Sequence, residues 1–600
     1  MLNWGIHLLF NNSYLAYQSS EGVLQIMKYY QMNRFFTRFT CLTLTILICA
    51  AALPTGGRIP EYAKKGMVVS SSAIASDIGK QVLQDGGNAI DAAVATAFAL
   101  AVTWPSAGNV GGGGFIVYRM NNGEVTTFDF REKAPLAAHP KMYLDDQGNL
   151  ITGSNHRGML SVGVPGTVAG LYAAHKKYGR LPWGKLVQPA IDLARKGIPF
   201  SLALHQHSKG RRQEWEKIPS TAAVMYKPGM VYYEPGETWK QPELAKTLKR
   251  IKKNGRDGFY KGETAEKLVA FIQREGGIIT QQDLEEYEAV ERKPVVGTYR
   301  GYRVFSMPPP SSGGVALLEM LNILEGYDLN ELGYKSADYI HVLSEVMRRA
   351  YADRAEHMGD PDFNPDLPVT QLISKEHAAR VRQTISMETA SVSDSTKYGQ
   401  LYDGTSTTHL SVVDEQGNAV SLTYTLENSY GCQIVAEGLG FFLNDEMGDF
   451  NPVPGLTNSR GLIGTSANQI QPGKRMLSCM TPTIIERDGK LFMVIGTPGG
   501  RTIINTVLQV ILNVVDHKMN IAAAIEAPRI HHQWLPDRLN FELFGLSPDT
   551  QHRLIEKGHT LNELNHASQG HAMGILIDDR IGYITGSADS RSPDAGVSGY

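Results

Sequence analysis

Two threonines at the same end of two short apolar segments carry the most chemical content of this sequence. Thr407 opens the run TTHLSVVD and Thr425 closes the run AVSLTYT, with the polar turn EQGN between them. Segments rich in Val, Thr and Leu on either side of a Gly-containing turn predict a β-hairpin. A turn centred on residues 415–418 pairs Thr408 with Thr425 and places Thr407 beside that pair. The open end of the hairpin is therefore a candidate site for a hydroxyl nucleophile.

A threonine hydroxyl is a weak nucleophile and needs a base within hydrogen-bond reach. Cleavage of the chain between Ser406 and Thr407 would give Thr407 a free α-amine, whose pKa of about 7.7 to 8.0 suits that role. The preceding segment, residues 386–406, is rich in Ser, Thr, Asp and Gly and poor in apolar residues, which predicts an exposed, flexible stretch. A self-cleaving precursor needs such a stretch, but an ordinary interdomain linker has the same composition.

Six further short sequence motifs occur along the chain, both before and after the hairpin segment. They are AGNVGGGGF (107–115), FDFREKAP (128–135), MPPPSSGG (307–314), FFLNDEMGDF (441–450), PGKRMLSCMTPTI (472–484) and GTPGG (496–500). Together with the hairpin segment, they resemble the γ-glutamyltransferases (γ-glutamyltranspeptidases), which are N-terminal nucleophile hydrolases. The resemblance extends from about Ala63 to Tyr600. It implies an α/β (α+β) fold, a four-layer α/β/β/α sandwich formed jointly by two processed chains.

The resemblance also implies how the chain is processed. Cleavage between Ser406 and Thr407 would give a large subunit, residues 54–406, and a small catalytic subunit, residues 407–600. Thr407 would then be both the nucleophile and, through its α-amine, the base. Thr425 matches the family threonine whose hydroxyl bonds to the nucleophile.

Paired glycines after an apolar strand, residues 491–495, are a candidate oxyanion hole. Glycine lets backbone N–H groups approach a reacting atom closely, although a Gly-Gly pair alone more often marks a turn. Gly499 and Gly500 match the family positions that stabilise the oxyanion of the tetrahedral intermediate.

A γ-glutamyl donor carries an α-carboxylate and an α-ammonium far from the scissile amide, so its site needs a cation and several anions. Arg131 matches the family arginine, and a guanidinium suits a carboxylate bidentately. Ser478 adds a hydroxyl donor. The acids Glu427, Glu446 and Asp449 match positions that recognise the ammonium, although acids in loops are usually only solvated.

Three residues depart from the family pattern. Cys479 stands where many members have a second serine that contacts the carboxylate, and a thiol is a weaker donor. Glu427 occupies a position that is Asn in some members and acidic in others. Arg460 falls where members with a lid carry an aromatic residue, so we expect a more open pocket and prominent hydrolysis.

Composition narrows the partners to small molecules. Hydrophobic residues make up 42% and charged residues 20% of the 600-residue chain, whose formal net charge is -2, so no nucleic acid or anionic membrane is indicated. Gly111–Gly114 lacks the spacing of a phosphate-binding loop, and His531-His532 lacks further metal ligands. We expect no cofactor and no metal. Cys432 and Cys479 are the cysteines left after the signal, and their spacing does not decide whether they form a disulfide.

The N-terminus resembles a secretory signal. Arg34 and Arg38 precede an apolar run, 41–53, which is too short to span a bilayer. Residues 1–53 are therefore the predicted signal region, with a true start near Met32, and the mature protein is expected to be periplasmic or secreted. An uncleaved anchor is the alternative.

Helices are predicted in both halves of the chain. Apolar residues at helical spacing indicate those over 185–196, 245–253, 264–275 and 337–352, whereas 88–102 is an Ala-rich segment after Gly86-Gly87 that predicts a buried helix. The predicted helices cover residues 88–102, 185–196, 245–253, 264–275, 337–352 with a continuation to 356, 502–515 and 521–526.

The sequence favours a self-processing enzyme that forms a γ-glutamyl ester on Thr407 from glutathione and other γ-glutamyl amides. Water or an amino-acid or peptide acceptor would then release the acyl group. One alternative is a related acylase acting on glutaryl-type cephalosporin amides, which would not need the ammonium-binding acids. Another is an unprocessed periplasmic binding protein with no catalytic activity.

Overall fold

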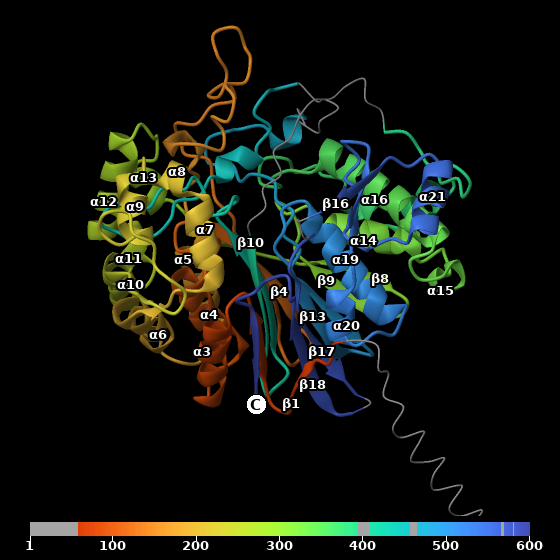
Figure 1. The fold of residues 1–600 in the computed structure, drawn as a ribbon, viewed down its shortest axis with the longest axis horizontal. Helices are drawn as coiled ribbons and strands as arrows, with labels where there is room; N and C mark the ends of the chain where they lie inside the picture. The colour runs from red at the N-terminus through yellow and green to blue at the C-terminus, as the bar shows by residue number, and fades with distance from the viewer. Residues whose placement is uncertain (1–57, 394–406, 456–464, 566–568, 580) are drawn as a thin grey trace, which may run out of the picture. The chain divides into compact units, whose positions relative to one another are not determined.

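The computed structural model describes residues 58–393, 407–455, 465–565, 569–579 and 581–600 (Figure 1). The chain divides into two units, Met1–Arg58 and Ile59–Tyr600, and the second carries the sheets and helices. The expected signal region 1–53, with its start near Met32, lies outside the described residues, as do Ser406 and Arg460. Within the described ranges, no helix has the length and apolar character needed to cross a membrane.

Two antiparallel sheets, each of seven strands among the described residues, form the centre of the second unit. The first has the order β1 (Glu61–Ala63), β18 (Tyr583–Ala588), β17 (Met573–Asp578), β13 (Lys490–Gly496), β12 (Thr483–Arg487), β9 (Tyr302–Ser306) and β8 (Val295–Tyr299). The second has the order β19 (Gly596–Gly599), β2 (Met67–Ser70), β10 (Thr407–Val413), β11 (Ala419–Thr425), β3 (Gly113–Arg119), β4 (Val125–Phe130) and β7 (Val290–Arg292). Strands from before and after Thr407 therefore occur in both sheets.

Helices cover the outer face of each sheet, while the inner faces pack on one another (Figure 1). The helices α4 (Ala89–Thr103) and α5 (Thr167–Tyr178) contact the second sheet, and α14 (Gly313–Leu324), α19 (Thr502–Val515) and α20 (Ile521–Glu526) contact the first. Apolar side chains from both sheets fill the space between them. The predicted α/β/β/α sandwich is confirmed.

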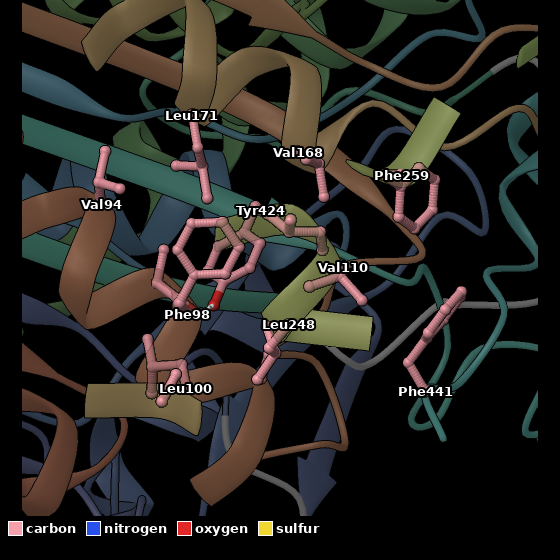
Figure 2. Close-up of a cluster of buried hydrophobic side chains, with 14 of the residues drawn as sticks. Val94, Phe98, Leu100, Val110, Val168, Leu171, Leu248, Phe259, Tyr424 and Phe441 are labelled. Carbon is pink, nitrogen blue, oxygen red and sulfur yellow. Dashed lines mark hydrogen bonds between the residues drawn. The ribbon is translucent and has the colours of Figure 1, made fainter. Parts of the chain in front are cut away.

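Helix α4 is buried along its whole length and supports the open end of the β10–β11 hairpin. Asn88 and Asp91 form a capping box, in which each side chain accepts the backbone N–H of the other residue. Tyr424 of β11 donates its hydroxyl to the carbonyl of Ala97 at 2.9 Å, inside the apolar cluster that Figure 2 shows around Phe98. This packing fixes β11 one residue before Thr425.

The predicted helices are found with small differences at their ends. Those over 502–515 and 521–526 match α19 and α20 at both ends. The others are α4, α6 (Trp183–Lys196), α10 (Pro242–Asn254), α12 (Gly262–Arg274) and α16 (Ala337–His357). Apolar spacing was a reliable signal for α6, α10 and α12, because each of them buries one apolar face, whereas α4 is buried on all sides.

The hairpin is present, but its predicted register is wrong by one residue. Thr407, not Thr408, pairs with Thr425. The loop has three residues, because the Asp414 N–H donates to the Asn418 carbonyl at 3.0 Å and Gly417 takes a φ of 84°. The Asp414 carboxylate stabilises this turn by accepting the backbone N–H of Asn418 at 2.9 Å. The shorter loop brings the candidate nucleophile directly opposite the second threonine.

Candidate active site

The candidate nucleophile starts a strand in the interior of the second sheet. Thr407 is buried, and its Oγ1 donates to Thr425 Oγ1 at 3.4 Å. Thr425 Oγ1 also accepts the N–H of Glu427 at 2.9 Å, which orients the hydroxyl. In the uncut chain the nitrogen of Thr407 belongs to a peptide bond and cannot act as a base. This arrangement can supply an oriented hydroxyl, and a base only after cleavage.

A cavity of about 560 Å³ opens at Thr407 and gathers most of the predicted site residues. Its walls include predicted residues from the hairpin, the acidic segment and the glycine turn, which are Arg131, Thr407, Thr425, Glu427, Asp449, Ser478, Cys479 and Gly500. Glu446 is fully buried behind this wall, against Arg131. The sequence had placed these residues far apart in the chain, and the fold brings them together.

The Arg131 guanidinium lies among carboxylate and carbonyl oxygens. Its Nη1 lies 2.5 Å from Glu446 Oε2 and 3.5 Å from Glu132 Oε2, and its Nη2 contacts the carboxylate of Asp449. Nε donates to the carbonyl of Met476 at 3.3 Å, and Nη2 donates to the carbonyl of Leu477 at 3.1 Å. The expected cation and the expected anions of the donor site are therefore paired with each other.

More acids surround Arg131 than one cation can balance. Oxygens of Glu427, Glu446 and Asp449 lie within 4.8 Å of one another. Burial raises the pKa of Glu446 well above its ordinary value, and burial together with the nearby Asp449 does the same for Glu427. Burial also raises the pKa of Glu132 to about 8. An ammonium group placed among these oxygens would relieve the excess of negative charge, and a divalent cation would meet the same ligands.

Ser478 and Cys479 line the cavity with different roles. The Ser478 hydroxyl accepts the N–H of Met480 at 3.1 Å, which leaves its own proton for an incoming acceptor. Cys479 Sγ accepts a bond from Arg354 Nη2 at 3.0 Å, and burial raises the pKa of the thiol. Arg354, on α16, is an additional cation of this cavity.

The glycine pair lies between β13 and α19, beside Thr407. Gly499 has a φ of 136° and Gly500 a φ of 55°, which few other residues adopt. The Gly499 carbonyl accepts the N–H and the hydroxyl of Thr502, at 3.1 and 2.8 Å. Among the described residues, the N–H groups of Gly499 and Gly500 have no acceptor. They are thus available to an oxyanion.

Several residues of the site went unnoticed in the sequence. Glu132 follows Arg131 directly, and its position next to a candidate cation was the available signal. Arg354 and Arg501 gave no signal, because nothing in their local sequence distinguishes them from surface arginines. The predicted cleavage and lid residues Ser406 and Arg460 lie outside the described residues. Residues 386–393 of the expected flexible stretch are described and are held in part by Ser391, whose hydroxyl donates to Glu345 at 2.5 Å.

Comparisons with known proteins agree with this geometry. The family model for gamma-glutamyltranspeptidase matches residues 75–599. The glutathione hydrolase proenzyme of Pseudomonas sp. (strain A14) is 48% identical over 521 residues, which cover 86% of this chain and 90% of that protein. The glutathione hydrolase proenzyme of Escherichia coli (strain K12) is 46% identical over 547 residues, covering 90% and 93%. The crystal structure of cephalosporin acylase from Bacillus halodurans superposes with a TM-score of 0.79 at 26% identity, covering 92% of this chain and 98% of that chain.

Proposed function

This chain belongs to the gamma-glutamyltranspeptidase family, and from that membership we propose that it is a self-processing γ-glutamyltransferase and glutathione hydrolase. The observation that carries the proposal is the position of Thr407. Its hydroxyl lies at a cavity that holds a charge cluster suited to an amino-acid zwitterion. The same cavity holds Gly500, whose N–H group has no acceptor among the described residues.

Processing comes first in the proposed mechanism. Thr407 Oγ1 attacks the carbonyl carbon of Ser406, and the bond from that carbon to the Thr407 nitrogen breaks as the ester forms. Water then hydrolyses the ester and leaves a carboxylate on Ser406 and an α-amine on Thr407. The products are the subunits 54–406 and 407–600, and they stay together as a heterodimer.

The α-amine then serves as the base for catalysis. It takes the proton of the Thr407 hydroxyl as Oγ1 attacks the γ-carbonyl of the donor, and the N–H groups of Gly499 and Gly500 stabilise the oxyanion. The proton passes to the departing amine, and a γ-glutamyl ester remains on Thr407. Water releases glutamate from this ester, whereas an amino-acid or peptide amine forms a new γ-glutamyl amide.

Donor recognition follows as an exchange of ionic partners. The α-ammonium of the donor enters among Glu427, Glu446 and Asp449, and the α-carboxylate takes up bonds from Arg131 that now go to Asp449. Ser478 donates its hydroxyl to the same carboxylate. Binding of the donor therefore replaces the ion pair between Arg131 and Asp449 by two ion pairs between the protein and the donor. Both charges of the donor are then necessary for binding.

The acid cluster also separates this function from its alternatives. A glutaryl-type amide has no ammonium, so a donor of that kind would leave the excess negative charge around Arg131 unrelieved. The likeness to a cephalosporin acylase supports the shared fold and acyl chemistry. A binding protein without catalysis would not need a glycine pair whose N–H groups lack acceptors.

We place the enzyme in the periplasm or outside the cell, on the basis of the predicted signal 1–53. Arg460 in place of an aromatic lid residue leaves the pocket open, with hydrolysis prominent over transfer. No cofactor takes part in the proposed reaction.

The test is intact mass measurement of the purified protein before and after incubation with glutathione. We expect two chains, one that ends at Ser406 and one that begins at Thr407. On brief exposure to glutathione the small subunit should gain the mass of one γ-glutamyl group. Thr407→Ala should leave one uncut, inactive chain. Thr408→Ala, one residue along the same strand, is the matched control and should still be cut. Cleavage of the Thr407→Ala chain at the same bond would contradict the mechanism.

A further inference from the structure

A second cavity, of about 660 Å³, also opens at Thr407. It shares Thr407 and Arg501 with the first cavity. Gly499 lies on its wall, whereas Gly500 lies on the wall of the first. The Thr407 hydroxyl and the glycine pair thus lie between two cavities. An acyl-transfer site needs two such cavities, one for the acyl group of the substrate and one for the amine that leaves or enters.

The wall of the second cavity is cationic. It includes Arg501, Arg538 and Arg591, and no Asp or Glu is among the described residues that line it. Arg591 is already neutralised, because it lies 2.8 Å from Glu542 and 3.0 Å from Asp589. Arg538 is therefore the cation of this wall on which recognition of an anion can be argued.

Arg538 is placed to meet an anion at the mouth of the cavity. It is exposed, and its guanidinium forms no ion pair with a described residue. Its backbone is fixed just before β15 (Leu539–Glu542), where its N–H donates to the Pro536 carbonyl at 2.9 Å. The neighbouring acid, Asp537, is bound to Arg348 and lies 3.2 Å from His532, so it does not neutralise Arg538. A fixed backbone with an unpaired cation suits recognition of a carboxylate.

We infer that the second cavity receives the part of the donor beyond the scissile amide, and then the acceptor, and that Arg538 selects molecules ending in a carboxylate. This inference rests on the proposed function. The cysteinylglycine released from glutathione ends in a carboxylate, as do amino-acid and peptide acceptors. In the transfer step the acceptor nitrogen bonds to the ester carbonyl carbon, the bond from that carbon to Thr407 Oγ1 breaks, and the amine proton passes to the Thr407 oxygen through its α-amine.

The test compares two acceptors that differ only in the terminal charge, glycylglycine and glycylglycinamide. The donor is γ-glutamyl-p-nitroanilide, whose leaving group has no carboxylate. In Arg538→Gln, the ratio of acceptor kcat/KM for glycylglycine to that for glycylglycinamide should fall about three- to five-fold, the size expected for an exposed ion pair. Arg538→Lys should restore part of the ratio, since it keeps the charge. Added KCl should lower the ratio in the parent more than in Arg538→Gln.

The matched control is Arg380→Gln, at an exposed arginine on α18 (Lys375–Arg382) that lines neither cavity. It should leave the ratio unchanged. An unchanged ratio in Arg538→Gln, in an enzyme that processes itself and hydrolyses the donor, would overturn this inference and leave the proposed function intact. A parent protein that neither cuts itself nor hydrolyses the donor would overturn the proposed function instead.

Discussion

Replacing Arg131 by methionine should separate the structural role of this residue from its role in binding. Its guanidinium is fully buried, forms an ion pair with Glu446 and lies 3.5 Å from Glu132, and both acids are also fully buried. Removing one partner of a buried ion pair costs about 3 to 5 kcal/mol, because the other charge stays buried and uncompensated. Unfolding entropy of about 2.1 cal/mol/K per residue, summed over Ile59–Tyr600, makes 1 kcal/mol worth roughly 1 °C. The apparent melting temperature of Arg131→Met should therefore fall by roughly 3 to 5 °C.

A second substitution distinguishes lost charge balance from a general packing defect. Glu446→Gln added to Arg131→Met removes one of the uncompensated carboxylates, so the double variant should regain a large part of the lost stability. Activity should stay low in both variants, because the donor carboxylate has lost its cation. A loss of about 2 to 5 kcal/mol corresponds to roughly a 30- to 4000-fold decrease in kcat/KM for glutathione.

The assay is scanning fluorimetry alongside glutathione kinetics, with Arg274→Met as control. Arg274 and Glu437 form an exposed pair, 57% and 59% accessible, which should contribute little. An Arg131→Met protein that melts with the parent would show that the guanidinium does not balance buried charge. A double variant no more stable than the single one would show that Glu446 is not the acid that Arg131 neutralises.

Three other substitutions give separate tests. Gly499 has a φ of 136°, and a Cβ added there would lie 2.5 Å from Thr502 Oγ1, so Gly499→Ala should lower kcat about 100-fold. Gly489 also has a positive φ but has open surroundings, so Gly489→Ala should not change kcat. Thr425→Val removes the partner of Thr407 Oγ1 and an acceptor of a backbone N–H, so the acylation rate in a stopped-flow burst should fall about 5- to 150-fold, and Thr425→Ser should retain most of it. Burial raises the folded-state pKa of Glu132 from its ordinary 4.5 to about 8, so folding takes up a proton and stability falls as pH rises between these values, by up to about 1.4 kcal/mol per pH unit. Glu132→Gln should flatten the melting temperature measured from pH 5 to 8, and curves parallel to those of the parent would contradict this reading.

Local patterns were sufficient for the helices and for the existence of the hairpin. The helix over 502–515 could be predicted because Gly499-Gly500 mark its start and its apolar residues continue to Val515. The hairpin register was missed because Asp414 and Gly417 build a loop one residue shorter than the polar segment suggests. Turn geometry depends on side-chain bonds to the backbone, which the run of polar residues does not specify.

The pairing of Arg131 with its acids could not be read from the sequence. Family resemblance gave Arg131 and Asp449 separate partners on the substrate, whereas in the structure they bind each other. Glu132 is adjacent to Arg131, and alternation along a strand would direct it to the opposite face. Both residues lie beyond the end of β4 at Phe130, so the alternation no longer applies and both side chains reach the same cluster.

The order of strands has a consequence for the lifetime of the enzyme. In the first sheet β1, β8 and β9 come from before Ser406 and the other four described strands from after it, and β10 of the second sheet lies between β2 and β11. The proposed cut therefore does not release two bodies but leaves a nick inside shared sheets. Before the cut, all the strands belong to one chain, so the rate at which they pair during folding does not depend on protein concentration. After it, unfolded pieces must meet by diffusion, with open strand edges that favour aggregation. Activation would thus make folding a single event that the mature enzyme cannot readily repeat.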